Sequence, residues 1–475
     1  MSGLFSTLGA TAQALQAQSV ALAVTSKNIA NVNNPNYARQ YVVFGNKGEI
    51  PTPQGPQAMN LQALSIQHYG DALLNQQVIT QIGLTSSDSA QQGWLQQAQA
   101  GLGQTLTNAS TSASSASTAT GDGSLASALD GLMNAFQALA AQPTDTGTRQ
   151  ALIGKASTLT QTFQSIDQNL AKVQTDAGTQ ISSDVSTANT LLANIASLNT
   201  EIEASEANNP GSAVDLRDSR ETDLEKLAAI IPVNVTEMSN GEDTVTTPDT
   251  TGNPVTLVQL GTVQGSLNYA GGVVTGGASA TTLGLGAGSI QGSITASTGP
   301  IQNLRTNLNS LASELVTAVN SAYNPSSVAG QDFFDPSGTT SATIALEPGL
   351  TATTLVAGTG GAGDNSIATA VAALANTTFS TSSGDAIDGT FSSFYATAVG
   401  TFGQSLSNTT ANLDDHTQVQ TLFENQRSSI SGVNMDEEMS NLVQFQQAYV
   451  ASSETFNIIN TLLGNEISAL GRSSG

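Results

Sequence analysis

Cysteine is absent from the sequence, and aromatic and charged side chains are scarce. Without cysteine, disulfides, thiolate metal sites and cysteine nucleophiles are excluded. Aromatic residues make up 4% and charged residues 10% of the 475 positions. This composition is typical of long polar-faced helices and exposed loops rather than of dense cores. The length is too great for one compact core, so we expect two to four domains.

Basic residues are also few, because 12 Lys and Arg stand against 36 Asp and Glu for a net charge of −24. Phosphate groups need basic partners, so we expect no nucleic acid and no anionic membrane among the ligands. No segment approaches the about 18 consecutive apolar residues of a membrane span, and we expect no membrane insertion. No basic residue precedes Lys27, which is unlike a secretory signal peptide. If the chain is exported, we expect its N-terminus to stay intact.

The residues that usually carry catalysis or hold metals are sparse. His68 and His416 are the two histidines and lie far apart in the sequence, whereas metal sites and catalytic triads need clustered partners. The segment GTGGAG places Gly358, Gly360 and Gly363 in the dinucleotide-binding spacing, but no strand–helix–strand succession surrounds it. We therefore predict no catalytic, cofactor-binding or metal-binding residues and a protein that is not an enzyme.

Two clusters of carboxylates have structural explanations. The segment DLRDSRETDLE (215–225) lacks the glycine and terminal glutamate of a calcium loop. Its alternating charges favour a solvated helix face with pairs three and four residues apart. The acidic run 436–438 follows Asn434 in the spacing of a capping box. Carboxylates there would stabilise the start of a helix.

Both ends of the chain show apolar residues spaced by seven, the signature of a helix packed along another helix. The C-terminal series is Met435, Leu442, Tyr449, Phe456, Leu463 and Leu470. The N-terminal series is Leu8, Leu15, Leu22 and Ile29, preceded by Leu4. Pro35 is expected to end the first helix. Each series is the candidate partner of the other.

The segments between the termini predict an α+β fold. Helical patterns cover most of the regions 61–230, 295–323 and 391–429, and we expect these to form a helical-bundle middle domain. After Pro232 the pattern alternates with a period of two, and an Asn-Gly pair in SNGED indicates a hairpin. We expect a β-rich insertion at 231–294 and a second irregular or β insertion at 324–390.

The expected terminal domain, 1–60 with 430–475, consists of long helices paired as a coiled coil. Polar residues such as Ser452 and Asn460 fall where a stable coil prefers Leu or Ile, so the pair is expected to be marginal alone. Unmatched apolar residues, including Phe445, Ile458 and Ile459, need further neighbours. The pattern leaves two alternatives open, namely a polymer or ring of subunits and a self-contained bundle.

Several segments resemble those of flagellar axial proteins. The stretch SKNIANVNNPNYARQ (26–40) is similar to the Asn-rich helix end and Pro-x-Tyr turn of rod, hook and hook-associated proteins. SGVNMDEEMSNLVQFQQAY (431–449) resembles the C-terminal signature of the hook-associated protein 1 (FlgK) family. RQALIGKASTLTQTF, DLRDSRETDLEKLA and AVNSAYNPSSVAGQDFF are similar to internal segments of that family, in the same order.

The resemblance implies a structural junction protein that forms a ring between hook and filament and supports the second junction protein. It also implies export through the flagellar type III channel, a cytoplasmic export chaperone and contact with the hook protein. The turn departs from the related Thr-Pro-Gly-Tyr pattern at Asn34 and Asn36, so its geometry is open. The alternatives are another hook or rod subunit, or a secreted adhesive protein that binds a ligand through its glycine-rich β region.

The expected assembly interface combines the two heptad series with the turn and with neighbouring apolar residues. It comprises Leu4, Leu8, Leu15, Leu22, Ile29, Pro35, Tyr37, Met435, Leu442, Phe445, Tyr449, Phe456, Ile459, Leu463 and Leu470.

Overall fold

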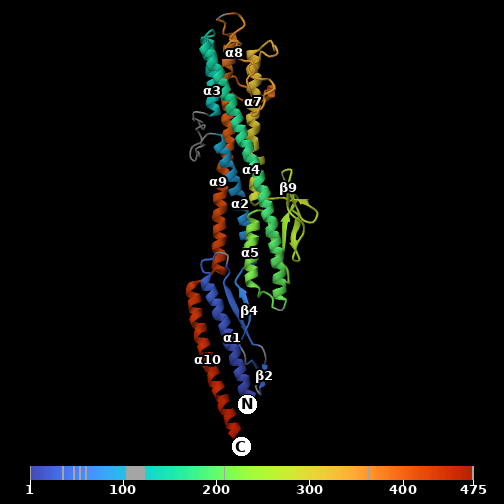
Figure 1. Cartoon of the computed structure of the whole chain (residues 1–475), viewed down its shortest axis with the longest axis vertical. Coiled ribbons are helices and arrows are strands. Elements are labelled where there is room, and N and C mark those ends of the chain that lie inside the picture. Colours follow the sequence, from blue (N-terminus) through green and yellow to red (C-terminus); the bar gives the residue numbers. More distant parts are fainter. Residues whose placement is uncertain are drawn as a thin grey trace. The chain divides into compact units, whose positions relative to one another are not determined.

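Long helices dominate the computed structural model, and small antiparallel sheets account for its strands (Figure 1). The two terminal helices pair with each other. Long helices together with small antiparallel sheets confirm the predicted α+β class. The structure describes residues 2–34, 37–46, 49–52, 55–58, 61–102, 124–207, 209–361 and 363–472.

The helices are α1 (Ser2–Ala30), α2 (Ala72–Gly101), α3 (Leu125–Ala141), α4 (Thr146–Glu206), α5 (Val214–Ala228), α6 (Ser289–Thr298), α7 (Pro300–Tyr323), α8 (Ser366–Ala373), α9 (Phe391–Ser431) and α10 (Met435–Arg472), with 3-10 turns η1 (Leu374–Asn376) and η2 (Thr381–Ser383). The strands are β1 (Gln40–Gly45), β2 (Glu49–Thr52), β3 (Gly55–Ala58), β4 (Gln62–His68), β5 (Asn234–Glu237), β6 (Asp243–Pro248), β7 (Pro254–Gln259), β8 (Thr262–Val263), β9 (Asn268–Ala270), β10 (Val273–Gly276) and β11 (Thr281–Thr282).

The chain divides into two compact units, and three of the four boundaries fall inside α2, α4 and α9, while the fourth lies directly before α6. Unit 1 comprises Met1–Thr85, Val185–Gly288 and His416–Gly475. Unit 2 comprises Ser86–Asp184 and Ser289–Asp415. The finer domain boundaries expected from the sequence stay a prediction.

In unit 1, α1 packs along α10 and also contacts the antiparallel pair β1–β4. The N- and C-termini lie at the same end of the helix pair, so α1 and α10 run antiparallel (Figure 1). A second antiparallel pair, β2–β3, lies between β1 and β4 in sequence. Residues 62–68, expected to be helical, form strand β4. Hydrogen bonding to β1 stabilises the extended conformation of this segment, and its side chains then point alternately to the two faces of the strand pair.

The rest of the strands in unit 1 form the four-stranded sheet β5-β6-β7-β8 and the three-stranded sheet β11-β10-β9. Along β6 every second residue is buried, as expected of a strand with one covered face. The predicted hairpin is confirmed between β5 and β6. Its Gly241 has a φ of 85°, in the left-handed region that favours glycine.

In unit 2, one apolar cluster joins α3, α4, α7, α8 and α9. Phe333 lies at its aromatic centre, with its ring centroid 5.0 Å from those of both Phe136 and Phe334 and 5.4 Å from that of Tyr323. One apolar face of α7, in the region expected to be helical, is buried in this cluster: Leu304, Leu308, Leu311, Leu315 and Val319. Helix α6 approaches α2 so closely at Gly292 that an added Cβ would lie 1.9 Å from the Ser87 carbonyl oxygen.

The glycine-rich segment at 358–363 has no strand before it in the described part of the chain. The carboxylate of Asp364 accepts hydrogen bonds from the backbone N–H groups of Gly360 and Ser366. An acidic side chain therefore occupies the place where a dinucleotide site would hold a phosphate.

Candidate assembly surface on the terminal helices

Small residues line the face of α1 that packs against the rest of unit 1. Ala17, Ala21, Val24, Thr25 and Asn28 are buried. Among the α1 side chains that the structure describes, none before Ala17 is buried. Helices in contact through alanine approach closely, since little side-chain volume separates their backbones. The burial is therefore concentrated in the half of α1 nearest its C-terminal end.

The predicted N-terminal series lies beside this buried face. All five members of the series have half-buried side chains: Leu4, Leu8, Leu15, Leu22 and Ile29. The fully buried positions of α1 belong to other, mostly smaller residues, so the role of this series in assembly stays a prediction. Because partly buried leucines retain accessible apolar surface, this series can still contact a further partner.

On α10, the buried positions are Glu438, Ile459 and Leu463. Three further predicted residues, Leu442, Phe445 and Phe456, are half-buried. The ring of Phe445 lies 6.2 Å from that of Phe44 on β1. These residues are spaced by three, four or eleven positions, so they lie on one face of α10, which is directed at α1 and β1.

Two residues of the predicted heptad, Met435 and Tyr449, are instead exposed. A straight helix advances 3.6 residues per turn, so a spacing of seven drifts around its surface, which accounts for Met435 at one end of the series. Drift does not account for Tyr449, because its neighbours in the series, Leu442 and Phe456, are half-buried. Tyr37 is buried. Pro35 lies outside the described residues, as does the side chain of Leu470.

A second apolar row runs along the exposed side of α10. This outer row comprises Met435, Met439, Val443, Val450, Ile458 and Leu462. Its members are spaced by four, seven or eight residues, so they follow one side of the helix. Most of the outer row was missed in the sequence, although the four-residue spacing from Met435 through Met439 to Val443 was a usable signal. A row of exposed apolar side chains along one helix makes this side of α10 a candidate interaction surface.

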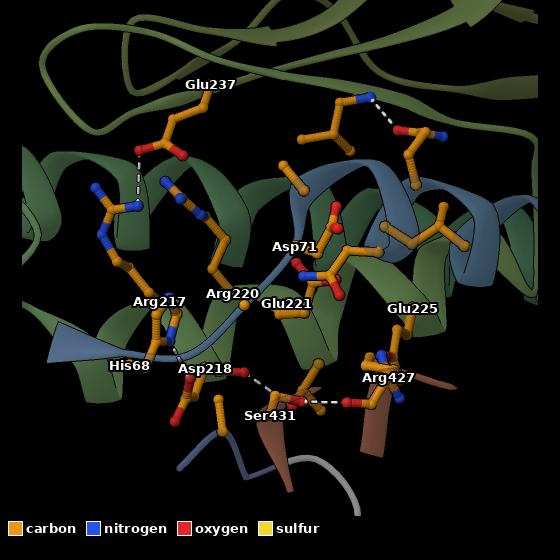
Figure 2. Close-up of a pocket in the computed structure, with 18 of the residues that line it drawn as sticks. His68, Asp71, Arg217, Asp218, Arg220, Glu221, Glu225, Glu237, Arg427 and Ser431 are labelled. Carbon is orange, nitrogen blue, oxygen red and sulfur yellow. Dashed lines mark hydrogen bonds and ion pairs between the residues drawn. The ribbon is translucent and has the colours of Figure 1, made fainter. Parts of the chain in front are cut away.

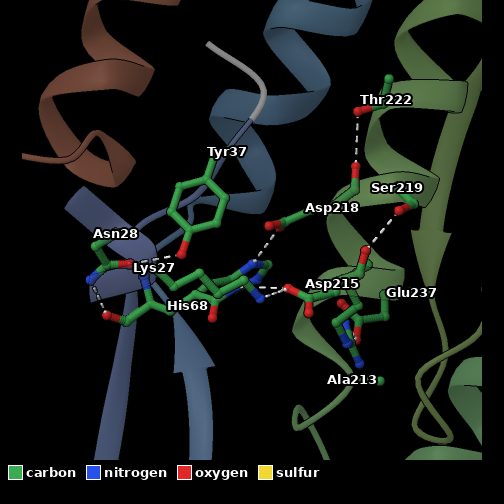
Figure 3. A network of polar contacts seen from close by, with 12 residues as sticks. Lys27, Asn28, Tyr37, His68, Ala213, Asp215, Asp218, Ser219, Thr222 and Glu237 are labelled. Atoms are coloured by element: carbon green, nitrogen blue, oxygen red, sulfur yellow. Dashed lines mark hydrogen bonds and ion pairs between the residues drawn. The ribbon is translucent and has the colours of Figure 1, made fainter. Parts of the chain in front are cut away.

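A buried polar cluster joins α1, the start of β1 and α10. We call it the clasp, and it comprises Asn28, Tyr37, Arg39, Gln40 and Glu438. Figure 3 shows Tyr37 and Asn28 directed at each other from their separate segments, with a hydrogen bond of 2.8 Å from the tyrosine hydroxyl to Asn28 Oδ1. Burial, followed by nearby carboxylates, raises the pKa of Tyr37, so its hydroxyl stays a donor.

Asn434 caps α10, as predicted, since its Oδ1 accepts a hydrogen bond from the N–H of Asp436 at 3.0 Å. The following glutamates have a second role that the capping pattern did not indicate. Glu438 accepts a hydrogen bond from Arg39 Nε at 2.7 Å, and Glu437 pairs with the same guanidinium at 2.9 Å. The acidic run therefore fastens α10 to the segment before β1 as well as stabilising the helix start.

Next to the clasp, unit 1 contains a polar cavity of about 310 Å³ (Figure 2). Its charged lining includes Asp218, Arg220, Glu221 and Glu225 of α5, together with Arg427 of α9. The expectation that 215–225 forms a solvated helix face was wrong for this side of α5, where Arg220 is buried. The sheet β5–β6 covers Arg220 and supplies its partner carboxylate, Asp243. This contact joins segments that are separated in the sequence, so the local charge pattern did not indicate it.

Ion pairs account for most of the charge in this cavity. Arg220 pairs with Asp243 at 2.8 Å, and Arg427 pairs with Glu225. Glu221 differs, because its buried Oε1 has no hydrogen-bond partner among the residues that the structure describes. Burial, then repulsion from Glu225 and Asp243, raises the pKa of Glu221 to about 7.

The described residues contain no group of three or more His, Cys, Asp or Glu side chains placed to hold a metal ion. His68 Nδ1 lies within hydrogen-bond distance of Asp218 Oδ1, at 3.2 Å, and both residues line the cavity (Figures 2 and 3). Within the described ranges, no helix combines the length and apolar character needed to cross a membrane.

Two family models match the sequence. A model described as the flagellar hook-associated protein FlgK helical domain matches residues 112–334. A model described as the C-terminal part of the flagellar basal body rod FlgEFG protein matches residues 424–470. The second match covers the end of α9 and nearly all of α10, including the outer row.

Known proteins similar to the chain carry related names. Flagellar hook-associated protein 1 of Bacillus subtilis (strain 168) is 26% identical over 531 aligned residues, which cover 99% of both chains. Flagellar hook-associated protein 1 of Salmonella typhimurium is 27% identical over 53% of this chain and 42% of that protein. The solved structure of the flagellar hook junction protein FlgK from Burkholderia pseudomallei aligns with a TM-score of 0.44 and 20% identity, over 55% of this chain and 46% of that one.

Proposed function

Because this chain belongs to the flagellar hook-associated protein 1 family, we propose that it is a structural junction subunit of the bacterial flagellum. In this role, copies of the chain assemble as a ring between the hook and the filament. The ring supports the next junction protein. Catalysis has no part in the proposal, which rests on packing between subunits.

The observation that carries this proposal is the outer row of α10. Val450 is 55% exposed, Ile458 61% and Leu462 48%. Isolated apolar side chains on a surface are ordinary, but a row that follows one helix face is typical of a surface that another chain covers. A ring of identical subunits would cover it by placing terminal helices of neighbouring copies side by side.

The proposed partners follow from the same role. They are further copies of this chain, the hook protein, the second junction protein and a cytoplasmic export chaperone. The proposed location is the hook–filament junction outside the cell, reached by secretion through the flagellar export channel. The net charge of −24 supports the absence of nucleic acid and anionic membranes from this set.

The test uses a flagellated strain that lacks its own copy of this protein and is complemented with variants. The double substitution Val450→Asp and Ile458→Asp places charge on the outer row. We expect the monomer to keep its unfolding free energy within about 0.5 kcal/mol, because both sites are exposed. We expect the cells to form hooks without filaments and to release filament protein into the medium.

The matched control is Gln444→Asp with Asn460→Asp, two exposed polar positions of the same helix that are not three, four or seven residues from a member of the outer row. This control should support normal filaments. Normal filaments in cells that carry the outer-row variant would contradict the proposed assembly surface. Normal filaments after deletion of 435–475 would contradict the junction role itself.

A further inference from the structure

Asn28 uses the whole hydrogen-bonding capacity of its side-chain amide. Its Nδ2 donates to the Gln40 carbonyl oxygen at 2.8 Å and to Glu438 Oε2 at 3.0 Å. Its Oδ1 accepts from the Tyr37 hydroxyl at 2.8 Å and from the Gln40 N–H at 3.0 Å. A primary amide has two donors and two principal acceptor positions, so Asn28 has no unused group.

Glu438 is as strongly committed from the opposite helix. Its side chain is 2% exposed, and it accepts from Asn28 Nδ2 and from Arg39 Nε. Arg39 also donates its backbone N–H to the carbonyl oxygen of Ser431, at the end of α9. A buried carboxylate without these partners would be strongly destabilising. The clasp is therefore satisfied at one position of α10 along α1, and any other position would leave Glu438 buried without these partners.

The apolar contacts of α1 do not discriminate between positions in the same way. Alanines stand at positions 10, 14, 17 and 21 of the packed face. If α10 moved along α1 by one heptad, about 10 Å at 1.5 Å per residue, Ala10 would replace Ala17 and Ala14 would replace Ala21. The small side chains would present nearly the same surface. A contact made of repeated alanines leaves the register open.

We propose that the clasp, and not the apolar face, fixes the register of α1 against α10. A single buried asparagine has this effect in coiled coils, where it selects one alignment by making every other alignment bury an unsatisfied amide. Because the register decides how the outer row stands relative to the exposed face of α1, the clasp determines the surface offered to a neighbouring subunit. Only this last consequence rests on the proposed function.

The experiment measures the register directly in the dilute monomer. The natural sequence has no cysteine, so Ser19→Cys with Gln447→Cys provides two unique sites for spin labels. Both positions are exposed, and each is equally far along its helix from Asn28 and Glu438, respectively. With the clasp intact, we expect one narrow distance distribution by pulsed electron paramagnetic resonance. After Asn28→Leu with Glu438→Leu, we expect a second, longer distance while the helical circular dichroism is retained.

The control replaces the same residue types at exposed positions of α10, as Asn457→Leu with Glu454→Leu, and should keep the single distance. If the double clasp variant does not fold, Glu438→Gln keeps the side-chain size and should broaden the distribution. A lower unfolding midpoint with one unchanged distance would overturn the inference, because a clasp that only stabilises the pair would give that result. The measurement needs no assembly, so it does not depend on the outcome of the filament assay.

Discussion

Both units of this chain bury many apolar side chains, and they differ in how many charged side chains are buried beside them. In unit 2, a continuous cluster of leucine and phenylalanine side chains is buried, with Phe136, Phe333 and Phe402 fully enclosed. In unit 1, apolar residues such as Val78, Leu192 and Val258 are buried as well, and buried charged and amide groups make further connections between its segments. Arg220 pairs there with Asp243, Arg217 with Glu206, and the clasp joins the terminal helices.

The buried apolar groups and the buried ion pairs have different effects: the first mainly stabilise the fold, and the second mainly fix the relative positions of segments. Apolar burial is non-directional and roughly proportional to the buried area, so the unit 2 core supplies stabilisation without demanding one arrangement. A buried ion pair contributes little net stability, because the loss of hydration offsets most of the attraction. It does require its partners at fixed positions. Unit 1 is therefore the part in which buried polar partners specify the relative positions of segments.

The comparison is tested most strongly in the apolar core of unit 2. Phe333→Ala removes a ring that touches three other aromatic rings, and we expect a loss of about 3–5 kcal/mol of unfolding free energy. Urea denaturation followed by circular dichroism measures it. Phe5→Ala, at a position 54% exposed on α1, should cost less than about 0.5 kcal/mol. Equal losses at the two sites would remove the contrast between the units.

The polar cavity of unit 1 should make stability depend on pH. The folded-state pKa of Glu221 is about 7, above its ordinary value of 4.5, so the folded chain holds this proton more tightly than the unfolded chain does. The unfolding free energy should therefore fall as pH rises from about 5 to about 7.5, by on the order of 2–3 kcal/mol. Glu221→Gln should remove this part of the decline.

The measurement compares unfolding midpoints of the natural chain and Glu221→Gln at pH 5 and pH 8. Glu454→Gln, at an exposed position of α10, serves as the matched control and should follow the natural chain. A Glu221→Gln profile that falls as steeply as that of the natural chain would show that the buried carboxyl is not the source. The pH dependence of the unfolding free energy would then not come from protonation of Glu221.

The smallest effect is expected at the rim of the clasp. Lys27 pairs with Asp215 at a solvent-accessible site, where the two side chains are 39% and 69% exposed. Exposed pairs contribute about 0–1 kcal/mol, and salt screens them. Lys27→Ala should therefore shift the unfolding midpoint only slightly, and the shift should disappear in 1 M salt. A loss as large as that of Phe333→Ala would show that exposed charges carry the fold of unit 1.

Sequence patterns predicted the elements whose signal is local. The face of α7 from Leu304 to Val319 repeats with the helical period and lies in the core as expected. The Asn-Gly turn predicted the β5–β6 hairpin because glycine tolerates the left-handed backbone conformation. The cap at Asn434 was likewise visible, since a helix start needs a side-chain acceptor within three residues.

Interactions between distant segments were not predicted. Nothing near Gln62–His68 in the sequence indicates the strand β4, which exists because β1 lies beside it. The helix 214–228 has the charge pattern of a solvated surface, yet the sheet β5–β6 covers one side and buries Arg220. The heptad series of α10 included two exposed residues. Met435 is exposed because a period of seven drifts around a straight helix, but this drift does not explain Tyr449, which lies between the half-buried Leu442 and Phe456.

The two terminal helices show which features the sequence determined and which the tertiary structure determined. The sequence by itself determined that both ends are helices with an apolar face, since helix formation and periodicity depend on residues a few positions apart. It also determined that α10 carries more apolar residues than one partner can cover. Only the tertiary structure decided their register, because Asn28 and Glu438 become partners through space. A hydrogen bond between residues so distant in sequence leaves no local pattern.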